Sequence, residues 1–215
     1  RNPEALYSLV YPLALNAGLD YVEITLLDGT ALLSLHRVDD EPLSPYTDTA
    51  GLAGYDWGLV GRVALGEIDD IGDKFADIVY TPWGWCFYIG GPIKQDGQTV
   101  GVVLVGMPMS GMVQRMAGQT ALQEAGTTTR REATVYGAAG QVIATTFGDI
   151  PTATLQVPPT FYRQVQASQD YQHLGRSLLA DGEDIVEAFG SFDARLGADL
   201  AVFSVALPGH QREQI

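Results

Sequence analysis

Residues 21–34 read YVEITLLDGTALLS and outline one complete unit of structure. Over residues 22–26, apolar side chains alternate with other residues, which is the period of a β-strand. The pair Asp28-Gly29 then predicts a tight turn, and a second apolar run follows over residues 31–35. The stretch therefore predicts a β-hairpin.

The same hairpin pattern returns later in the chain. Residues 132–145 read EATVYGAAGQVIAT, and a shift of 111 residues takes Val22 to Ala133 and Gly29 to Gly140. Self-similarity of this kind is typical of a duplicated structural unit.

A second group of landmarks repeats with a shift of 100 residues, which takes Gly90 to Gly190 and Pro108 to Pro208. In each copy we expect a strand, a turn with glycine, and a second strand that ends before proline. Proline suits a strand exit because it cannot donate to the hydrogen-bond ladder. The first strands of these pairs are expected at residues 85–93 and 184–192.

Each copy also has room for one more strand, expected at residues 74–80 and 173–180. Five antiparallel strands in this order form a PAS-like sheet. Apolar residues at helical spacing predict helices over residues 3–17 and 110–125. The predicted fold class is α+β: two tandem PAS-like modules, each an antiparallel five-stranded sheet flanked by helices, with a long N-terminal helix.

The composition excludes several classes of function. The net charge is −14, with 12 basic and 26 acidic residues, which argues against binding to nucleic acid or to an anionic membrane surface. The longest apolar run, residues 100–109, is too short for a membrane span of about 20 residues. Cys86 is the single cysteine, so no internal disulfide or thiol metal cluster is expected. Its aromatic neighbours predict a buried, inert thiol.

The patterns that mark catalysis are missing from the sequence. The three histidines, His36, His173 and His210, have no zinc-binding spacing, and there is no nucleophile elbow or phosphate loop. The acidic stretch GEIDDIGDK at residues 66–74 could suggest calcium, but it does not match the calcium-loop pattern, and a capped, solvated turn is favoured. No catalytic residue, metal or cofactor is predicted.

The best candidates for a ligand site lie in the first copy. A ligand cavity needs mostly apolar walls and a few fixed polar groups. Arg62 or Lys74 could hold a carboxylate, whereas Asp56 or Asp77 could hold an amine beside aromatic rings. Strand alternation divides the aromatic residues between two faces, so some of them should be ordinary core. The predicted ligand-binding residues are Asp56, Trp57, Arg62, Lys74, Asp77, Tyr80, Trp83, Trp85 and Tyr88.

The whole pattern resembles the double Cache sensor domains of bacterial transmembrane receptors. Besides the two hairpins, the similar stretches are GRVALGEIDDIGDKFADIV (61–79), FYIGGPIKQDGQTVGVVLVGMPMSGM (87–112) and EAFGSFDARLGADLAVFSVALP (187–208). The resemblance implies an extracytoplasmic ligand-sensing domain, attached to the cell membrane only through flanking spans and dimeric in the full receptor. The output could be a cyclase, a histidine kinase or a chemoreceptor.

The resemblance also implies a division of the chain. It gives an N-terminal helix (1–20), a membrane-distal module that holds the ligand (21–109), a linker helix (110–130), a membrane-proximal module (131–208) and the start of an exit helix (209–215). The proximal module is expected to relay a signal rather than to bind a ligand.

One departure bears on the ligand. The amino-acid-binding branch of these domains carries an Arg-Trp-Tyr-like cluster, whereas here Gly84 precedes Trp85 and no arginine lies nearby. An amino-acid ligand is therefore not supported, and a carboxylate or an amine stays open.

Two other functions compete with a ligand sensor. One is a ligand-free structural module that dimerises through residues 3–17 or relays a signal from a partner protein. The other is a cytosolic PAS- or GAF-like domain or a small enzyme, although no nucleophile–base pair supports catalysis.

Overall fold

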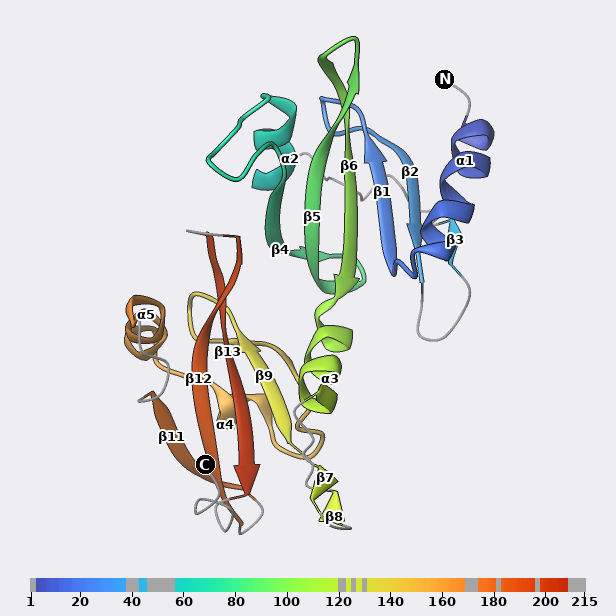
Figure 1. Ribbon diagram of the computed structural model, residues 1–215. Helices are drawn as coiled ribbons and strands as arrows, with labels where there is room; N and C mark the ends of the chain where they lie inside the picture. Colours follow the sequence, from blue (N-terminus) through green and yellow to red (C-terminus); the bar gives the residue numbers. More distant parts are fainter. Residues whose placement is uncertain are drawn as a thin grey trace. The chain divides into compact units, whose positions relative to one another are not determined.

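The computed structural model forms two compact units, residues 1–108 and 109–215, which we call the first and second modules (Figure 1). The structure describes residues 3–37, 43–45, 57–119, 123–124, 127–128, 131–168, 174–180, 183–195 and 198–208. Four of the sequence-based expectations lie outside these residues: Asp56, His173, His210 and the exit helix at 209–215.

The first module is an antiparallel sheet with a helix against each face. Its elements are α1 (Pro3–Asn16), β1 (Tyr21–Thr25), β2 (Ala31–His36), β3 (Ser44–Pro45), α2 (Gly58–Ala64), β4 (Phe75–Thr81), β5 (Gly84–Gln95) and β6 (Gln98–Pro108). The strand order is β3-β2-β1-β6-β5-β4. The predicted hairpin is confirmed, with Gly29 in the turn at a φ of 81° that favours glycine.

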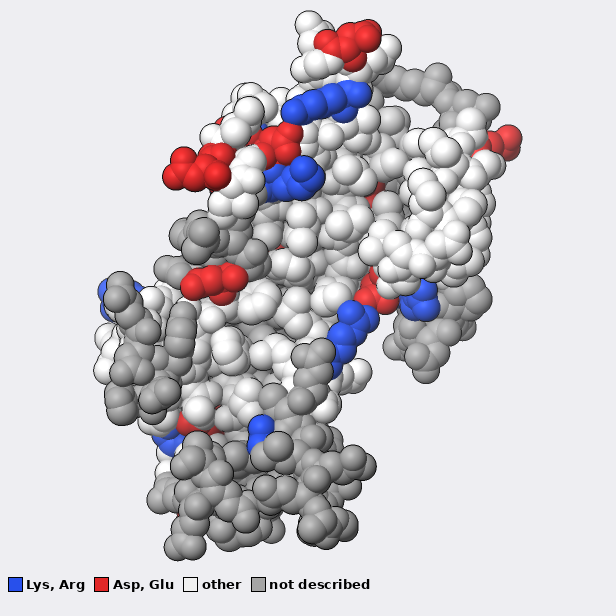
Figure 2. Space-filling view, in the orientation of Figure 1, with Lys and Arg blue, Asp and Glu red and all other residues white. Residues whose placement is uncertain are grey.

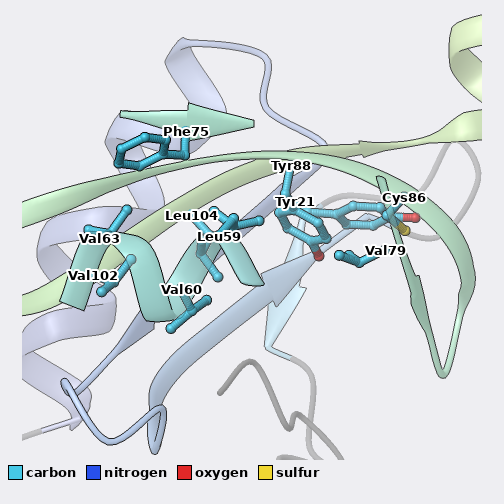
Figure 3. Close-up of a cluster of buried hydrophobic side chains, with 10 residues drawn as sticks. All are labelled: Tyr21, Leu59, Val60, Val63, Phe75, Val79, Cys86, Tyr88, Val102 and Leu104. Carbon is cyan, nitrogen blue, oxygen red and sulfur yellow. The ribbon is translucent and has the colours of Figure 1, made fainter. Parts of the chain in front are cut away.

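The two helices of this module pack on opposite faces of the sheet. On the α1 face, Leu6, Val10 and Ala14 of the helix pack on a cluster that includes Val22 and Leu35. The α2 face carries the other residues of each strand, because successive side chains alternate. Figure 3 shows its core, with side chains of α2 packed against residues of four strands.

The second module repeats this arrangement. Its elements are α3 (Met109–Gln119), β7 (Gln123–Glu124), β8 (Thr127–Thr128), β9 (Glu132–Tyr136), β10 (Val142–Thr145), α4 (Thr152–Leu155), α5 (Pro159–Ala167), β11 (Gly175–Ala180), β12 (Glu183–Arg195) and β13 (Ala198–Pro208). The strand order β10-β9-β13-β12-β11 matches the five main strands of the first sheet. In both sheets the last strand lies beside the first strand of the hairpin.

The pairing register confirms the duplication. Val22 pairs with Val105 in the first module, and Ala133 pairs with Val205 in the second, so the shifts of 111 and 100 residues apply to strands that lie side by side.

The match of Gly90 to Gly190 is wrong by one residue. Gly90 pairs with Leu104, whereas Phe189, not Gly190, pairs with Ser204. The hairpin of β12 and β13 has register shifts on both sides of Asp193, while that of β5 and β6 has one, after Ile93. A slip of one residue moves a side chain to the other face. Phe189 therefore lies in the core, where the first module has glycine.

Two predicted helices differ from the structure. The helix expected over 110–125 ends at Gln119, and Gln123–Glu124 pair as a strand with Thr127–Thr128. Helix α1 has 14 residues, so the long N-terminal helix is not shown. Within the described residues, no helix combines the length and apolar character needed to cross a bilayer.

Candidate ligand-binding site

Strands β1 and β2 carry buried polar side chains on the α2 face of the first sheet. Glu23 and Thr25 are 2% exposed, Ser34 is 3% exposed and His36 is 7% exposed. Every residue of β1 is buried. Val22 and Ile24 belong to the cluster that packs against α1, and Tyr21 belongs to the cluster on the other face. Burying polar groups costs free energy unless they find partners, so such a group of residues needs an explanation.

Glu23 is the ionisable centre of this group. The Tyr88 hydroxyl on β5 donates a hydrogen bond of 2.9 Å to its Oε1 atom. Burial raises the pKa of Glu23 to about 7, although the hydroxyls of Tyr88 and Ser34 lower it in part. The carboxyl therefore changes its charge near neutral pH.

Five rings surround this end of the face, and we call Tyr21, His36, Trp57, Trp83 and Tyr88 the ring cluster. Ring centroids are 5.1 Å apart for His36 and Trp83, and 5.0 Å apart for Trp57 and Tyr88. Tyr21 lies 6.0–6.2 Å from three of the others. Figure 3 shows the rings of Tyr21 and Tyr88 side by side, beyond the α2 side chains. Burial lowers the pKa of His36, which favours its neutral form.

Gly106 makes room for this arrangement. It lies opposite Tyr88 in the β5–β6 pair and opposite Tyr21 in the β1–β6 pair. A Cβ atom at Gly106 would lie 2.5 Å from the Tyr88 ring, which is too close for an undistorted contact. The glycine therefore lets the ring lie flat against the strand and reach Glu23.

Of the predicted site residues, the structure brings Trp57, Trp83 and Tyr88 together in the ring cluster. Asp77 pairs with Tyr88 across β4 and β5, so it lies on the same face, and burial raises its pKa.

The other predicted residues lie elsewhere. Arg62 donates to Glu67 and stacks on Phe75, and Lys74 pairs with Asp73; both basic side chains are exposed. Figure 2 shows basic side chains beside acidic ones in this part of the surface. Tyr80 packs edge-on against Trp85, and both project from the opposite face of the sheet to Tyr88.

Glu23, Thr25, Ser34 and His36 were not selected from the sequence. In YVEIT, the alternation of apolar and polar residues is that of a strand with one wet face. Counting outward from the predicted turn could have found them. Glu23 then lies opposite Ser34, and Tyr21 lies opposite His36, so polar side chains gather on one face of the hairpin.

The second module has a comparable acid on the corresponding face, but its partners are internal. Glu187 lies at the Tyr88 position, since each is opposite the same place on the last strand. It accepts hydrogen bonds from the hydroxyls of Tyr136 (2.9 Å) and Ser204 (2.8 Å). Arg176 forms an ion pair with it at 2.5 Å. This acid is therefore fully satisfied by the chain itself.

Other chemically active groups have structural partners. Asp69 accepts hydrogen bonds from the backbone of Ile71 and Gly72, as a capped turn should. The described residues contain no group of three or more candidate metal ligands. Cys86 is buried as predicted, and burial raises the pKa of its thiol to about 11.

Solved structures with the same architecture are sensor domains. A domain of a sensory box/GGDEF family protein from Vibrio parahaemolyticus aligns with 97% of this chain and 79% of its own, at 12% identity and a TM-score of 0.60. The extracellular domain of the histidine kinase vpHK1S-Z8 aligns over 97% and 75%, at 13% identity and a TM-score of 0.61. The ligand-binding domain of the Pseudomonas aeruginosa amino acid chemoreceptor PctB, in complex with L-Arg, aligns over 100% and 82%, at 12% identity and a TM-score of 0.53.

The chain has the fold of these receptor sensor domains. This confirms the two tandem PAS-like modules that the resemblance to double Cache domains implied. No family model matches the sequence, and no curated protein does.

Proposed function

We propose that this chain is the extracytoplasmic ligand-sensing domain of a transmembrane signal-transduction receptor, and that a small molecule binds on the α2 face of the first module. The observation that carries the proposal is the pair of buried polar residues Glu23 and Thr25 on the same face as the ring cluster. Mostly apolar walls with a few fixed polar groups are typical of ligand sites. In the second module the corresponding polar side chains bind one another instead.

The remaining parts of the proposal come from the resemblance to double Cache domains. Residues 21–109 are then the membrane-distal module and residues 131–208 the membrane-proximal one, and the two ends of the chain lead to the membrane. The output is a cyclase, a histidine kinase or a chemoreceptor, and no catalytic step is assigned to this domain. A ligand switches such a receptor only to the extent that it prefers one of its conformations.

Tryptophan fluorescence tests the proposal directly, because Trp57, Trp83 and Trp85 are the three tryptophans of the chain and all lie in the first module. A panel of carboxylates, amines, purines and sugars is screened by thermal unfolding. A ligand at 100 times its Kd adds about 2.7 kcal/mol, or about 5–10 °C for a domain of this size.

The matched variants are Trp57→Phe, within the ring cluster, and Trp85→Phe, on the opposite face. We expect the ligand to change the fluorescence of the wild type and of Trp85→Phe, and to bind Trp57→Phe more weakly. No thermal shift across the panel would contradict a ligand-sensing role. Equal effects of the two variants would place the ligand elsewhere.

A second candidate function is supported by helix α1. Leu9 and Leu13 are 65% and 64% exposed, although they belong to the apolar spacing that predicted this helix. Two copies of the chain could bury these side chains against each other. Sedimentation of the wild type and of Leu9→Glu/Leu13→Glu tests this: a concentration-dependent dimer that the variant loses supports a dimerisation module.

A further inference from the structure

The first module buries an acid whose counter-charge is missing from the described chain. No ion pair joins Glu23 to a basic side chain among the described residues. The described lysines and arginines of the module have other partners: Arg37 lies near Asp20, Arg62 pairs with Glu67, and Lys74 and Lys94 pair with Asp73. An unpaired buried carboxylate is costly, so a ligand that neutralises it gains much of that free energy.

The sequence between Arg37 and Trp57 adds no basic side chain to the first module. Residues 38–56 contain no lysine, arginine or histidine, and their ionisable side chains are Asp39, Asp40, Glu41, Tyr46, Asp48, Tyr55 and Asp56. This segment adds to the net charge of −14 of the chain, and a negative net charge favours the approach of a cation over that of an anion.

The ring cluster suits a cation for an independent reason. Aromatic faces attract ammonium and guanidinium groups, and cages of several rings hold quaternary ammonium ligands. The rings of Tyr21 and Trp57 each contact the ring of Tyr88, whose hydroxyl reaches Glu23.

Thr25 provides a second polar contact. It is 2% exposed, and its hydroxyl has no hydrogen-bond partner among the described residues. It follows Glu23 by two residues on β1, so both side chains lie on one face, about 7 Å apart along the strand. A buried hydroxyl without a partner is rare, and a bound ligand or water can supply the missing hydrogen bond.

In the second module, the chain itself supplies the cation that neutralises a comparable buried acid. The guanidinium of Arg176 pairs with Glu187 and also donates to the backbone carbonyls of Leu155 and Gln156. The residue at the Arg176 position in the first module is Asp77, so no such guanidinium is available there.

We infer that the ligand of the first module carries an ammonium or guanidinium group, which binds between Glu23 and the ring cluster as Arg176 binds Glu187. This inference rests on the proposed sensor function and names its ligand class. Glu23 must be ionised to hold the cation, so binding strengthens as the pH rises. Among the described residues, the other titratable groups on this face are Tyr21, His36, Asp77, Cys86 and Tyr88, and Arg62 of α2 acts electrostatically on Asp77.

The experiment compares cations with neutral molecules of the same shape. The pairs are propylamine with propan-1-ol, butylguanidine with N-butylurea, and choline with 3,3-dimethylbutan-1-ol. Each is titrated against the 215-residue chain, with tryptophan fluorescence and calorimetry as readouts at pH 6, 7 and 8.5. Wild type is compared with Glu23→Gln, and with Asp96→Asn as the control. Asp96 is an exposed turn residue at a φ of 52°, a conformation that asparagine also tolerates.

We expect at least one cation to bind and its neutral partner to fail. Glu23→Gln should weaken that binding about 10- to 100-fold, as loss of a hydrogen bond to a charged group does, while Asp96→Asn should not. Below pH 7 the affinity should fall by up to about tenfold per unit. An anionic or neutral molecule could bind instead, with an affinity that Trp57→Phe lowers and Glu23→Gln leaves unchanged. That result would contradict the cationic ligand and still support the sensor function. If no molecule of any class binds, both proposals fail.

Discussion

The hydroxyl of Tyr88 donates a hydrogen bond of 2.9 Å to the carboxyl of Glu23, which precedes it by 65 residues in the chain. The bond joins β5 to β1 across β6, the strand between them. It is therefore a tertiary contact between the hairpin and the rest of the sheet. The bond also offsets part of the free energy that burial of the Glu23 carboxyl costs.

Replacement of Tyr88 by phenylalanine should destabilise the first module by about 1–3 kcal/mol, because the buried carboxyl loses its donor. The control is Tyr80→Phe, since Tyr80 is 68% exposed and its hydroxyl lies at the surface. Urea unfolding followed by tryptophan fluorescence measures both. Equal midpoints for the two variants would show that the hydrogen bond contributes nothing to stability.

The pH dependence of stability should carry the signature of Glu23. Its pKa is about 7 in the folded chain and about 4.5 when unfolded, so the folded state holds the proton more tightly. The stabilisation is present below pH 4.5 and is lost as the pH rises through 7, by about 3 kcal/mol in all. His36, whose pKa is lowered by burial, acts in the opposite direction.

Glu23→Gln isolates this effect from the other titrations. We expect the free energy of unfolding of the variant to fall less between pH 5 and 8 than that of the wild type. Chemical denaturation at four pH values in this range measures the difference. Parallel pH profiles for the two proteins would mean that Glu23 titrates normally.

The duplication and the positions of the main strands could be predicted because they depend on short signals. The Asp28-Gly29 turn and the proline at the end of β6 mark where strands begin and end, and each occurs at its expected place. The register between β12 and β13 could not be predicted to the residue. An extra irregularity near Asp193 shifts one strand, and the sequence has no signal that distinguishes it from a regular turn.

The candidate site was harder to predict for a physical reason. The alternation in β1 distinguishes its two faces but not whether the second face is wet or covered. Glu23 therefore looked like a solvent-facing residue, although it is 2% exposed and bonded to Tyr88 of the ring cluster. The aromatic run at residues 80–88 pointed to the correct end of the sheet, but strand pairing places Tyr80 and Trp85 on the other face.

Gly106→Ala should destabilise the first module by about 1–3 kcal/mol, because the new methyl group displaces the Tyr88 ring that lies 2.5 Å from its position. The second module has Ala206 at the corresponding place, where it faces Glu187 rather than a ring. Gly118→Ala is the control: a methyl group there meets no neighbour in α3 and should stabilise the helix slightly. Urea unfolding that finds Gly106→Ala as stable as the wild type would show that Tyr88 can move freely.

In the second module, Arg176→Leu should cost about 3–5 kcal/mol, because it leaves the carboxyl of Glu187 buried without a cation. The double variant Arg176→Leu/Glu187→Gln removes the charge as well, and Tyr136 and Ser204 can still donate to the amide oxygen. We therefore expect it to recover at least half of the loss. Arg163→Leu is the control, since Arg163 lies at the surface of α5.

Two spectroscopic readouts locate that loss within the chain. Far-UV circular dichroism reports both modules, whereas tryptophan fluorescence reports the first alone, because residues 109–215 contain no tryptophan. A loss confined to the second module lowers the dichroism midpoint in urea and leaves the fluorescence midpoint unchanged. If the single and double variants are equally unstable, Arg176 acts through its bonds to the carbonyls of Leu155 and Gln156 rather than by neutralising Glu187. The comparison with an external cation in the first module would then lose its support.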